Sequence, residues 1–137
     1  MASVLKVDDL RGNTAAGNIT ITSEGGAATM QLQQGVAKTW LHYNQTTNNN
    51  RNSLSISSVA DTAAGHWKGT LSNPMADAYY VISGAGCYDS NVTDSARADD
   101  QSAFPESTTV FQVGTFNNAN QHYDNTYNMI SIHGDLA

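Results

Sequence analysis

The residues best suited to chemistry are four histidines, one cysteine and a set of carboxylates. His42, His66, His122 and His133 are spread along the chain, and no His-Glu-x-x-His or comparable metal-binding motif contains them. The sequence also has no Gly-x-Ser-x-Gly elbow and no P-loop. Glycoside hydrolysis by paired carboxylates needs a larger scaffold than this short chain, whose acids gather mainly in one stretch. We therefore predict no enzyme activity, no catalytic residues, no metal site and no cofactor.

The carboxylates of residues 89–106 are the main acidic feature. They lack the Asp-x-Asp-x-Asp-Gly pattern that places calcium ligands on one tight loop, so a solvated acidic loop is expected. The stretch contains Asp89, Asp94, Asp99, Asp100 and Glu106. A metal ion on an oligomer axis stays open as an alternative, because symmetry would supply several copies of a residue such as His122 or His133.

Aromatic residues provide the other candidate chemistry, since their rings can stack on sugars. Trp40 and Trp67 lie in apolar alternating segments, where core packing is the expectation. Tyr123 lies in residues 117–125, which are polar throughout, so its ring should be exposed. Exposed aromatic and amide groups on a loop form a plausible recognition surface. We predict a receptor-facing loop that contains Asn117, Asn118, Asn120, His122 and Tyr123.

Composition limits the classes of protein to consider. The chain has 137 residues and a formal net charge of −6, and 41 residues are Asn, Ser or Thr. Leu, Ile, Val and Phe total only 24, so the core is lean and favours completion by partner subunits. Six scattered basic residues argue against nucleic-acid binding. No apolar run is long enough to insert into a membrane, and no secretory signal is visible. The single Cys87 excludes an internal disulfide and is expected to be a buried structural thiol.

Residues 1–35 read as an extended N-terminal arm. Short alternating segments occur at 18–22 and 27–33, separated by glycine-containing turns. The arm has too few large apolar side chains to form a core, so it must lie against something else. We predict that it serves attachment or oligomerisation. Its expected inter-subunit contacts are Val4, Leu5, Val7, Leu10, Ile19 and Ile21.

Residues 36–137 read as a succession of strands joined by Asn-, Ser- and Gly-rich turns. In residues 53–59, Leu54 and Ile56 are expected to point inward and the serines outward. No helical pattern of ten or more residues appears after residue 10. The expected fold is all-β, an antiparallel β-sandwich of jelly-roll type that forms a knob behind the arm. The expected strands cover residues 36–43, 53–59, 66–71, 78–83, 108–116 and 126–133.

Several strings along the chain occur together in one order. They are ASVLKVD (2–8), GVAKTWLHYNQT (35–46), NSLSISSVAD (52–61), GHWKGTL (65–71), NPMADAYYVIS (73–83) and MISIHGD (129–135). In this order they resemble a module of tail-fibre-like virion structural proteins of marine and freshwater phages, including cyanophages. The resemblance covers most of the chain. The long acidic stretch and the short N-terminal part depart from the family's pattern.

The resemblance implies a structural and adhesive role without catalytic residues. The expectation is a short homotrimeric fibre or fibre tip for host attachment, located in the virion and assembled in the cytoplasm of the host bacterium. Its partners would be other virion proteins, of the tail or the major capsid protein, and a host surface glycan is a candidate ligand. The alternative is a capsid decoration (cement) protein that stabilises the head shell, because no dedicated tail-anchoring domain is recognisable.

Overall fold

The structure is a computed structural model that describes residues 6–15, 19–22, 25–26, 28–87, 101–117 and 121–137, with only the backbone at 33, 34 and 101. The chain divides into two compact units, Met1–Val36 and Ala37–Ala137. Each unit is described by itself below.

The first unit contains a short hairpin. Strands β1 (Thr20–Thr22) and β2 (Thr29–Gln31) pair antiparallel, with Ile21 opposite Met30. A single helical turn, α1 (Leu32–Gly35), follows β2. Every residue of both strands is exposed. Since an isolated two-stranded hairpin is marginally stable in water, this hairpin needs a further surface to stabilise it.

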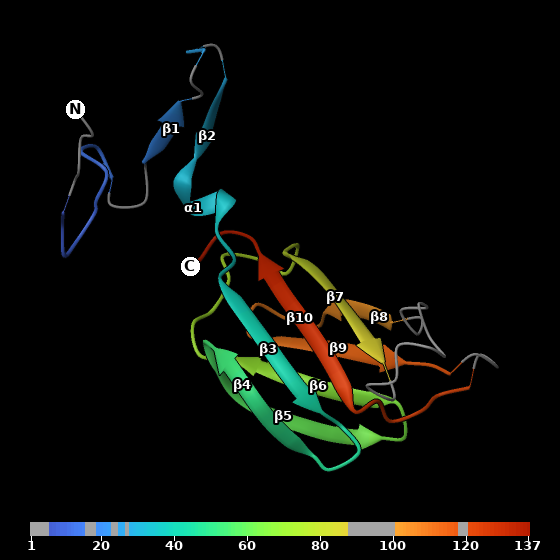
Figure 1. The fold of residues 1–137 in the computed structure, drawn as a ribbon. Helices are drawn as coiled ribbons and strands as arrows, with labels where there is room; N and C mark the ends of the chain where they lie inside the picture. The colour runs from blue at the N-terminus through green and yellow to red at the C-terminus, as the bar shows by residue number, and fades with distance from the viewer. Residues whose placement is uncertain (1–5, 16–18, 23–24, 27, 88–100, 118–120) are drawn as a thin grey trace. The chain divides into compact units, whose positions relative to one another are not determined.

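The second unit is an antiparallel β-sandwich of two four-stranded sheets (Figure 1). We call them the front sheet, with strand order β4-β3-β10-β7, and the back sheet, with order β5-β6-β9-β8. The strands of the front sheet are β4 (Asn49–Leu54), β3 (Thr39–Asn44), β10 (Tyr127–His133) and β7 (Val81–Cys87). The strands of the back sheet are β5 (Ile56–Ala63), β6 (His66–Leu71), β9 (Val110–Thr115) and β8 (Gln101–Pro105).

The core lies between the two sheets and is centred on Trp67, which is fully buried. Its ring contacts Tyr43 at 5.0 Å between centroids and Phe111 at 5.8 Å in an edge-on arrangement. Such tilted aromatic pairs add to the stabilisation from buried area. The other buried apolar residues are Leu41, Leu71, Met75, Tyr80, Val113, Ile130 and Ile132. Alternation along the strands therefore sends one face of each sheet into a common core.

The predicted all-β antiparallel sandwich is confirmed. In the sandwich, three pairs of consecutive strands are hydrogen-bonded neighbours: β3–β4 in the front sheet, and β5–β6 and β8–β9 in the back sheet. The jelly-roll connectivity stays a prediction. The polar stretch expected to be a loop up to residue 106 contains β8, which is an error of the sequence reading. The polar, acidic composition of the stretch hid this strand, which ends at Pro105 on the edge of its sheet, where proline is tolerated.

Two predicted core positions are wrong. Trp40 was expected in the core but is 38% exposed, because Thr39, Leu41 and Tyr43 occupy the inward positions of β3. Leu54 was expected to point inward with Ile56 but is 46% exposed. Between them Ser55 has a φ of 57°, so the chain turns there from the front sheet into the back sheet and the alternation is interrupted.

Candidate functional site

Three loops meet at one end of the sandwich and form a small pocket. Thr46 comes from the β3–β4 turn, Ala64 from the β5–β6 turn, and His122, Tyr123 and Asp124 from the loop between β9 and β10. We call these five residues the loop-end cluster. The predicted recognition loop therefore contributes three of the five lining residues, and the two turns were not predicted to join it.

Hydrogen bonds attach the β9–β10 loop to the sandwich. The Tyr123 amide donates to the Thr115 carbonyl at 3.1 Å, and the Thr115 hydroxyl donates to the Tyr123 carbonyl at 2.6 Å. Gly65 donates its amide to Asp124 Oδ1 at 2.6 Å. Gly65 has a φ of 67°, and a Cβ there would overlap the backbone of Tyr123 and Thr115. The close approach of the turn and the loop thus requires glycine at this position.

A buried glutamine lies beneath the loop-end cluster. Gln45 is 1% exposed, and its Nε2 faces three acceptors: Asp61 Oδ1 at 3.2 Å and the carbonyls of Ala63 and His66 at 3.3 and 3.4 Å. Its Oε1 lies 3.3 Å from the Thr115 hydroxyl oxygen, whose single hydrogen is directed to the Tyr123 carbonyl at the shorter distance of 2.6 Å. The amide therefore links β3, the β5–β6 turn and β9. This network holds the loops in one arrangement before any ligand binds.

The His122 ring packs between two other rings. Its centroid lies 3.9 Å from that of His66 and 4.4 Å from that of Phe116. Sequence reasoning found no partner for either histidine, because the contact depends on the pairing of β6 with β9 and on the return of the loop. Tyr123 is 39% exposed, as its polar surroundings predict. His122 and Tyr123 thus present aromatic surface beside the carboxylate of Asp124.

The other predicted members of the recognition loop have different outcomes. Asn117 is half-buried, and its backbone N–H donates to the backbone carbonyl of Gln121 at 2.8 Å. This bond closes the loop on itself. Asn118 and Asn120 lie outside the described residues. Among the described residues, no group of three or more His, Cys, Asp or Glu side chains could hold a metal ion. The lining of the pocket thus combines two aromatic rings, the Thr46 and Tyr123 hydroxyls and the Asp124 carboxylate.

The outer face of the front sheet carries a second group of residues that sequence reasoning missed. Arg51 lies over the Tyr127 ring, with its guanidinium carbon 4.3 Å from the centroid. Its Nη1 is 3.3 Å from His42 Nε2. Burial, and then the Arg51 charge, lower the pKa of His42 below its usual value. Trp40 and Met129 flank this group on the same face, and both are exposed.

The arm residues predicted to form inter-subunit contacts are exposed where the structure describes them. Val7, Leu10 and Ile21 are about half exposed, and Ile19 is half-buried. Val4 and Leu5 lie outside the described residues, as do Asp89, Asp94, Asp99 and Asp100 of the acidic stretch. Cys87, expected to be buried, is only half-buried, because it ends the edge strand β7. The inter-subunit role of the arm stays a prediction.

Comparisons with known proteins give no relative for this chain. No family model, no curated protein and no solved structure matches it. Within the described part of the chain, no helix is both long and apolar enough to span a bilayer.

Proposed function

We propose that this chain is a bacteriophage virion structural protein, a short fibre or fibre tip that attaches to the host surface. The observation that carries the proposal is the loop-end cluster at one end of the sandwich, where hydrogen bonds hold Tyr123 and Asp124 and ring contacts hold His122. Loops on a rigid scaffold are the usual place for recognition residues. The order of sequence strings that resembles phage fibre modules supports the same role.

Attachment by this module would be multivalent. A pocket lined by so few polar groups offers weak affinity for one sugar. We propose a homotrimer, in which three copies of the pocket raise the avidity without any new contact. The exposed apolar residues of the arm, Val7, Leu10 and Ile21, support subunit association there. Light scattering on the purified chain should give three times the mass of the 14.6 kDa monomer. A monomer at micromolar concentration would refute the trimer.

A second function, decoration of the capsid, is favoured by the same exposed apolar arm. An arm without a core of its own can lie over seams between capsid proteins and add buried area to the shell. In this function the sandwich would face solvent and need no ligand.

Immunogold electron microscopy on intact particles separates the two functions. Antibody against the purified chain should label the tail if the chain is a fibre, and the head if it is a decoration protein. The fibre proposal predicts tail label that is lost when the antibody is first absorbed with purified chain. Particles without any specific label would refute both functions.

A further inference from the structure

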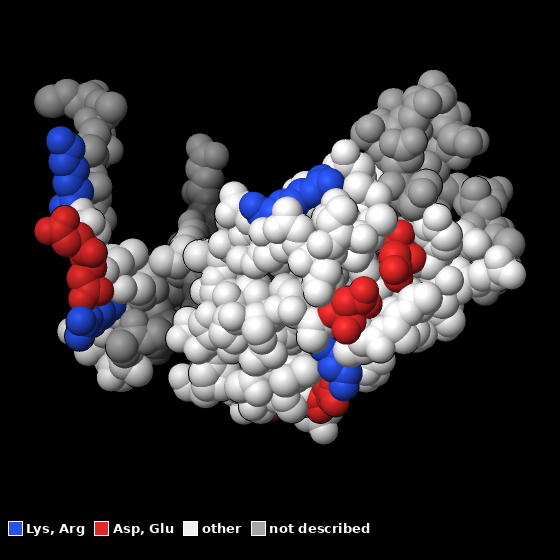
Figure 2. All heavy atoms as spheres, turned by 90° about the horizontal axis from the view of Figure 1, so that it is seen from below, with Lys and Arg blue, Asp and Glu red and all other residues white. Residues whose placement is uncertain are grey.

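The outer face of the front sheet has an unusual charge balance. Its four strands contain no Asp or Glu, although the whole chain has twelve acidic and six basic residues. The face instead carries Arg51, His42 and His133. Figure 2, which views the molecule from below, shows that charged side chains cover only a small part of the sandwich on that side. Within these four strands, no carboxylate competes with an anionic partner for a cationic group on this face.

A β-bulge places Arg51 on this face. In the pairing of β3 with β4, His42 is opposite Asn52 and Tyr43 is opposite Asn50, so Arg51 is the extra residue. Bulges redirect a side chain out of the regular alternation of the strand. Here the redirected guanidinium stacks over Tyr127 and contacts His42.

The guanidinium of Arg51 is positioned but not neutralised. Within the described part of the chain, the ion pairs are Arg11–Asp9 and Lys68–Glu106, and Arg51 has no carboxylate at ion-pair distance. Stacking on Tyr127 holds the planar group in place at low entropic cost and leaves its edge free to donate. A guanidinium edge matches the two oxygens of a carboxylate or the oxygens of a phosphate.

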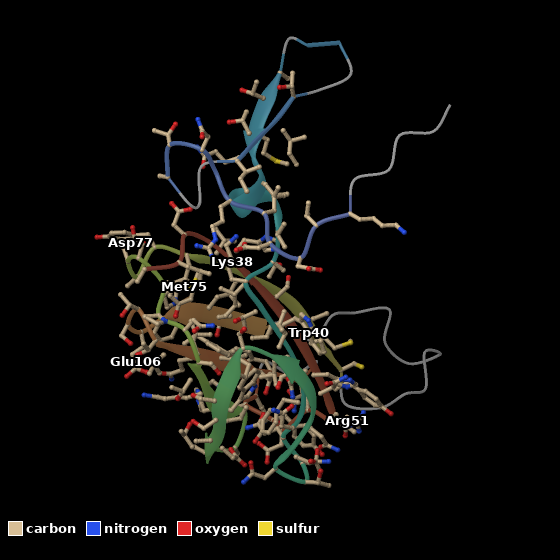
Figure 3. All side chains as sticks on the ribbon, turned by 90° about the vertical axis from the view of Figure 1, so that its left-hand side faces the viewer. Lys38, Trp40, Arg51, Met75, Asp77 and Glu106 are labelled. Atoms are coloured by element: carbon tan, nitrogen blue, oxygen red, sulfur yellow. The ribbon has the colours of Figure 1, made fainter. Side chains whose placement is uncertain are left out.

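An aromatic surface lies next to this cation. Trp40 precedes His42 by two positions on β3 and so points to the same face, about 7 Å away along the strand. Figure 3 shows Trp40 and Arg51 on one side of the sandwich, with Glu106 on the opposite side. A shallow depression lined by Ser83, Ala85, Met129 and Ser131 continues the surface toward β7. A flat ring, small polar groups and a cation that has no carboxylate partner among the described residues form the chemistry that recognises a charged sugar.

We propose that the outer face of the front sheet binds an anionic saccharide. The sugar ring stacks on Trp40, and its carboxylate or phosphate group is bound by Arg51. This site is distinct from the loop-end cluster, and its role in host attachment rests on the proposed function. A second copy of this chain is the less favoured occupant. In a self-complementary pairing the same face of the partner copy would meet Arg51, and its four strands supply no carboxylate to bind the guanidinium.

Tryptophan fluorescence tests the site directly, because Trp40 is exposed on this face and Trp67, the other tryptophan, is fully buried. The purified full chain, in its solution assembly, is titrated with trigalacturonate, its fully methyl-esterified form, galactose 6-phosphate and inorganic phosphate. The ester keeps the sugar rings and removes the charge, whereas phosphate keeps a charge and removes the ring. The two charged sugars distinguish a carboxylate from a phosphate as the preferred group.

The expected result is a saturable change in emission with at least one charged sugar. The ester and inorganic phosphate should bind at least about tenfold more weakly, since hydrogen bonds to charged groups contribute that much or more. Arg51→Gln should weaken binding by about tenfold or more, and Arg51→Lys, which keeps the charge but loses the planar edge, by less. The matched control Lys68→Gln, on the back sheet, should leave binding unchanged. Thermal unfolding of each variant verifies that it is folded.

Several results would overturn the inference. They are equal binding of all four probes, no binding by either charged sugar, and unchanged affinity in Arg51→Gln. Protection of Trp40 from acrylamide quenching in the ligand-free assembly would identify the face as an interface between copies instead. These measurements use the purified chain and are independent of its place in a virion. If the chain binds the sugar but is missing from particles, the saccharide site is upheld and the attachment role is refuted. If antibody labels the tail but the chain binds no charged sugar, the attachment role is upheld and the saccharide site is refuted.

Discussion

The Gln45 amide offers the sharpest test of how the loop-end cluster is positioned. Gln45→Glu keeps the size and shape of the side chain but replaces its donor with an oxygen. That oxygen would face Asp61 Oδ1 and the carbonyls of Ala63 and His66, all within 3.4 Å of the present nitrogen. Four oxygens would then meet in a position that is 1% exposed. The substitution therefore sets an acceptor against three acceptors that now share the two hydrogens of the Gln45 amide.

The magnitude follows from these contacts. The amide nitrogen has two hydrogens, so at most two hydrogen bonds are lost, and at about 1 kcal/mol each their loss costs about 2 kcal/mol. Burying a carboxylate next to Asp61 costs at least about 1 kcal/mol more. We expect Gln45→Glu to lower the free energy of unfolding by about 3 kcal/mol at pH 7. With an m-value of about 1.5 kcal/mol/M, the urea midpoint should fall by about 2 M.

The pH dependence of this loss identifies its cause. Burial and Asp61 should raise the pKa of the introduced carboxyl in the folded state above its unfolded value of about 4.3. The protonated carboxyl can donate one hydrogen bond, so the difference from wild type should shrink as the pH falls toward about 4. It should grow as the pH rises through the folded-state pKa, because the folded state must then hold the charge.

A matched control uses the second glutamine near the cluster. Gln121 is exposed, and its Oε1 accepts from Asn117 Nδ2 at 3.3 Å, which a carboxylate can also do. Gln121→Glu should change the free energy of unfolding by less than about 0.5 kcal/mol. Urea unfolding of both variants at pH 7 and pH 4.5 is the assay. If Gln45→Glu costs no more than Gln121→Glu at pH 7, the proposed network around the Gln45 amide is wrong.

Two further predictions concern the core. Burial, with nearby carboxylates adding to it, raises the pKa of Tyr43 and Tyr80 to about 12, against about 10 in the unfolded chain. The stability that these two phenols contribute is present below pH 10 and lost as the pH rises toward 12. Tyrosinate absorbance should therefore show two of the six tyrosines ionising last, together with unfolding. Ionisation of all six tyrosines near pH 10 would contradict the burial of Tyr43 and Tyr80. Gly69→Ala adds a Cβ that overlaps the Phe111 ring, and it should lower the free energy of unfolding by about 1–3 kcal/mol in thermal unfolding. The control Gly25→Ala adds a Cβ with nothing within 4 Å and should lower it by less than about 0.5 kcal/mol. Equal losses in the two variants would contradict the packing at Phe111.

Local patterns predicted six of the eight strands of the sandwich, but they missed β4 and β8, which lie mostly in polar stretches expected to be loops. They also left open which face of a strand is buried. Alternation placed β3 and β10 within a few residues of their observed bounds. It could not rank Trp40 against Leu41 and Tyr43, since both faces of β3 carry large side chains. The positive φ of Ser55 was equally hidden, because a serine gives no signal of that conformation. The turn at this residue moves Leu54 and Ile56 into different sheets.

The candidate sites depend on contacts between distant parts of the chain. Polarity alone predicted that Tyr123 is exposed, and this needs only local information. The contact of His122 with His66 needs the pairing of β6 with β9, which no local pattern specifies. The bulge at Arg51 is likewise invisible in a polar run of asparagines, because its register is set by β3. Both sites therefore emerge from the sheet topology.

Cell binding by the purified chain tests host attachment most directly. Fluorescently labelled chain is added to the bacteria on which the particles grow, before the particles are added. The account predicts saturable binding to these cells, no binding to resistant cells that lack the surface glycan, and slower adsorption of the particles in proportion to the bound chain. Absence of binding by the purified chain, with particle adsorption unchanged, would contradict the attachment function.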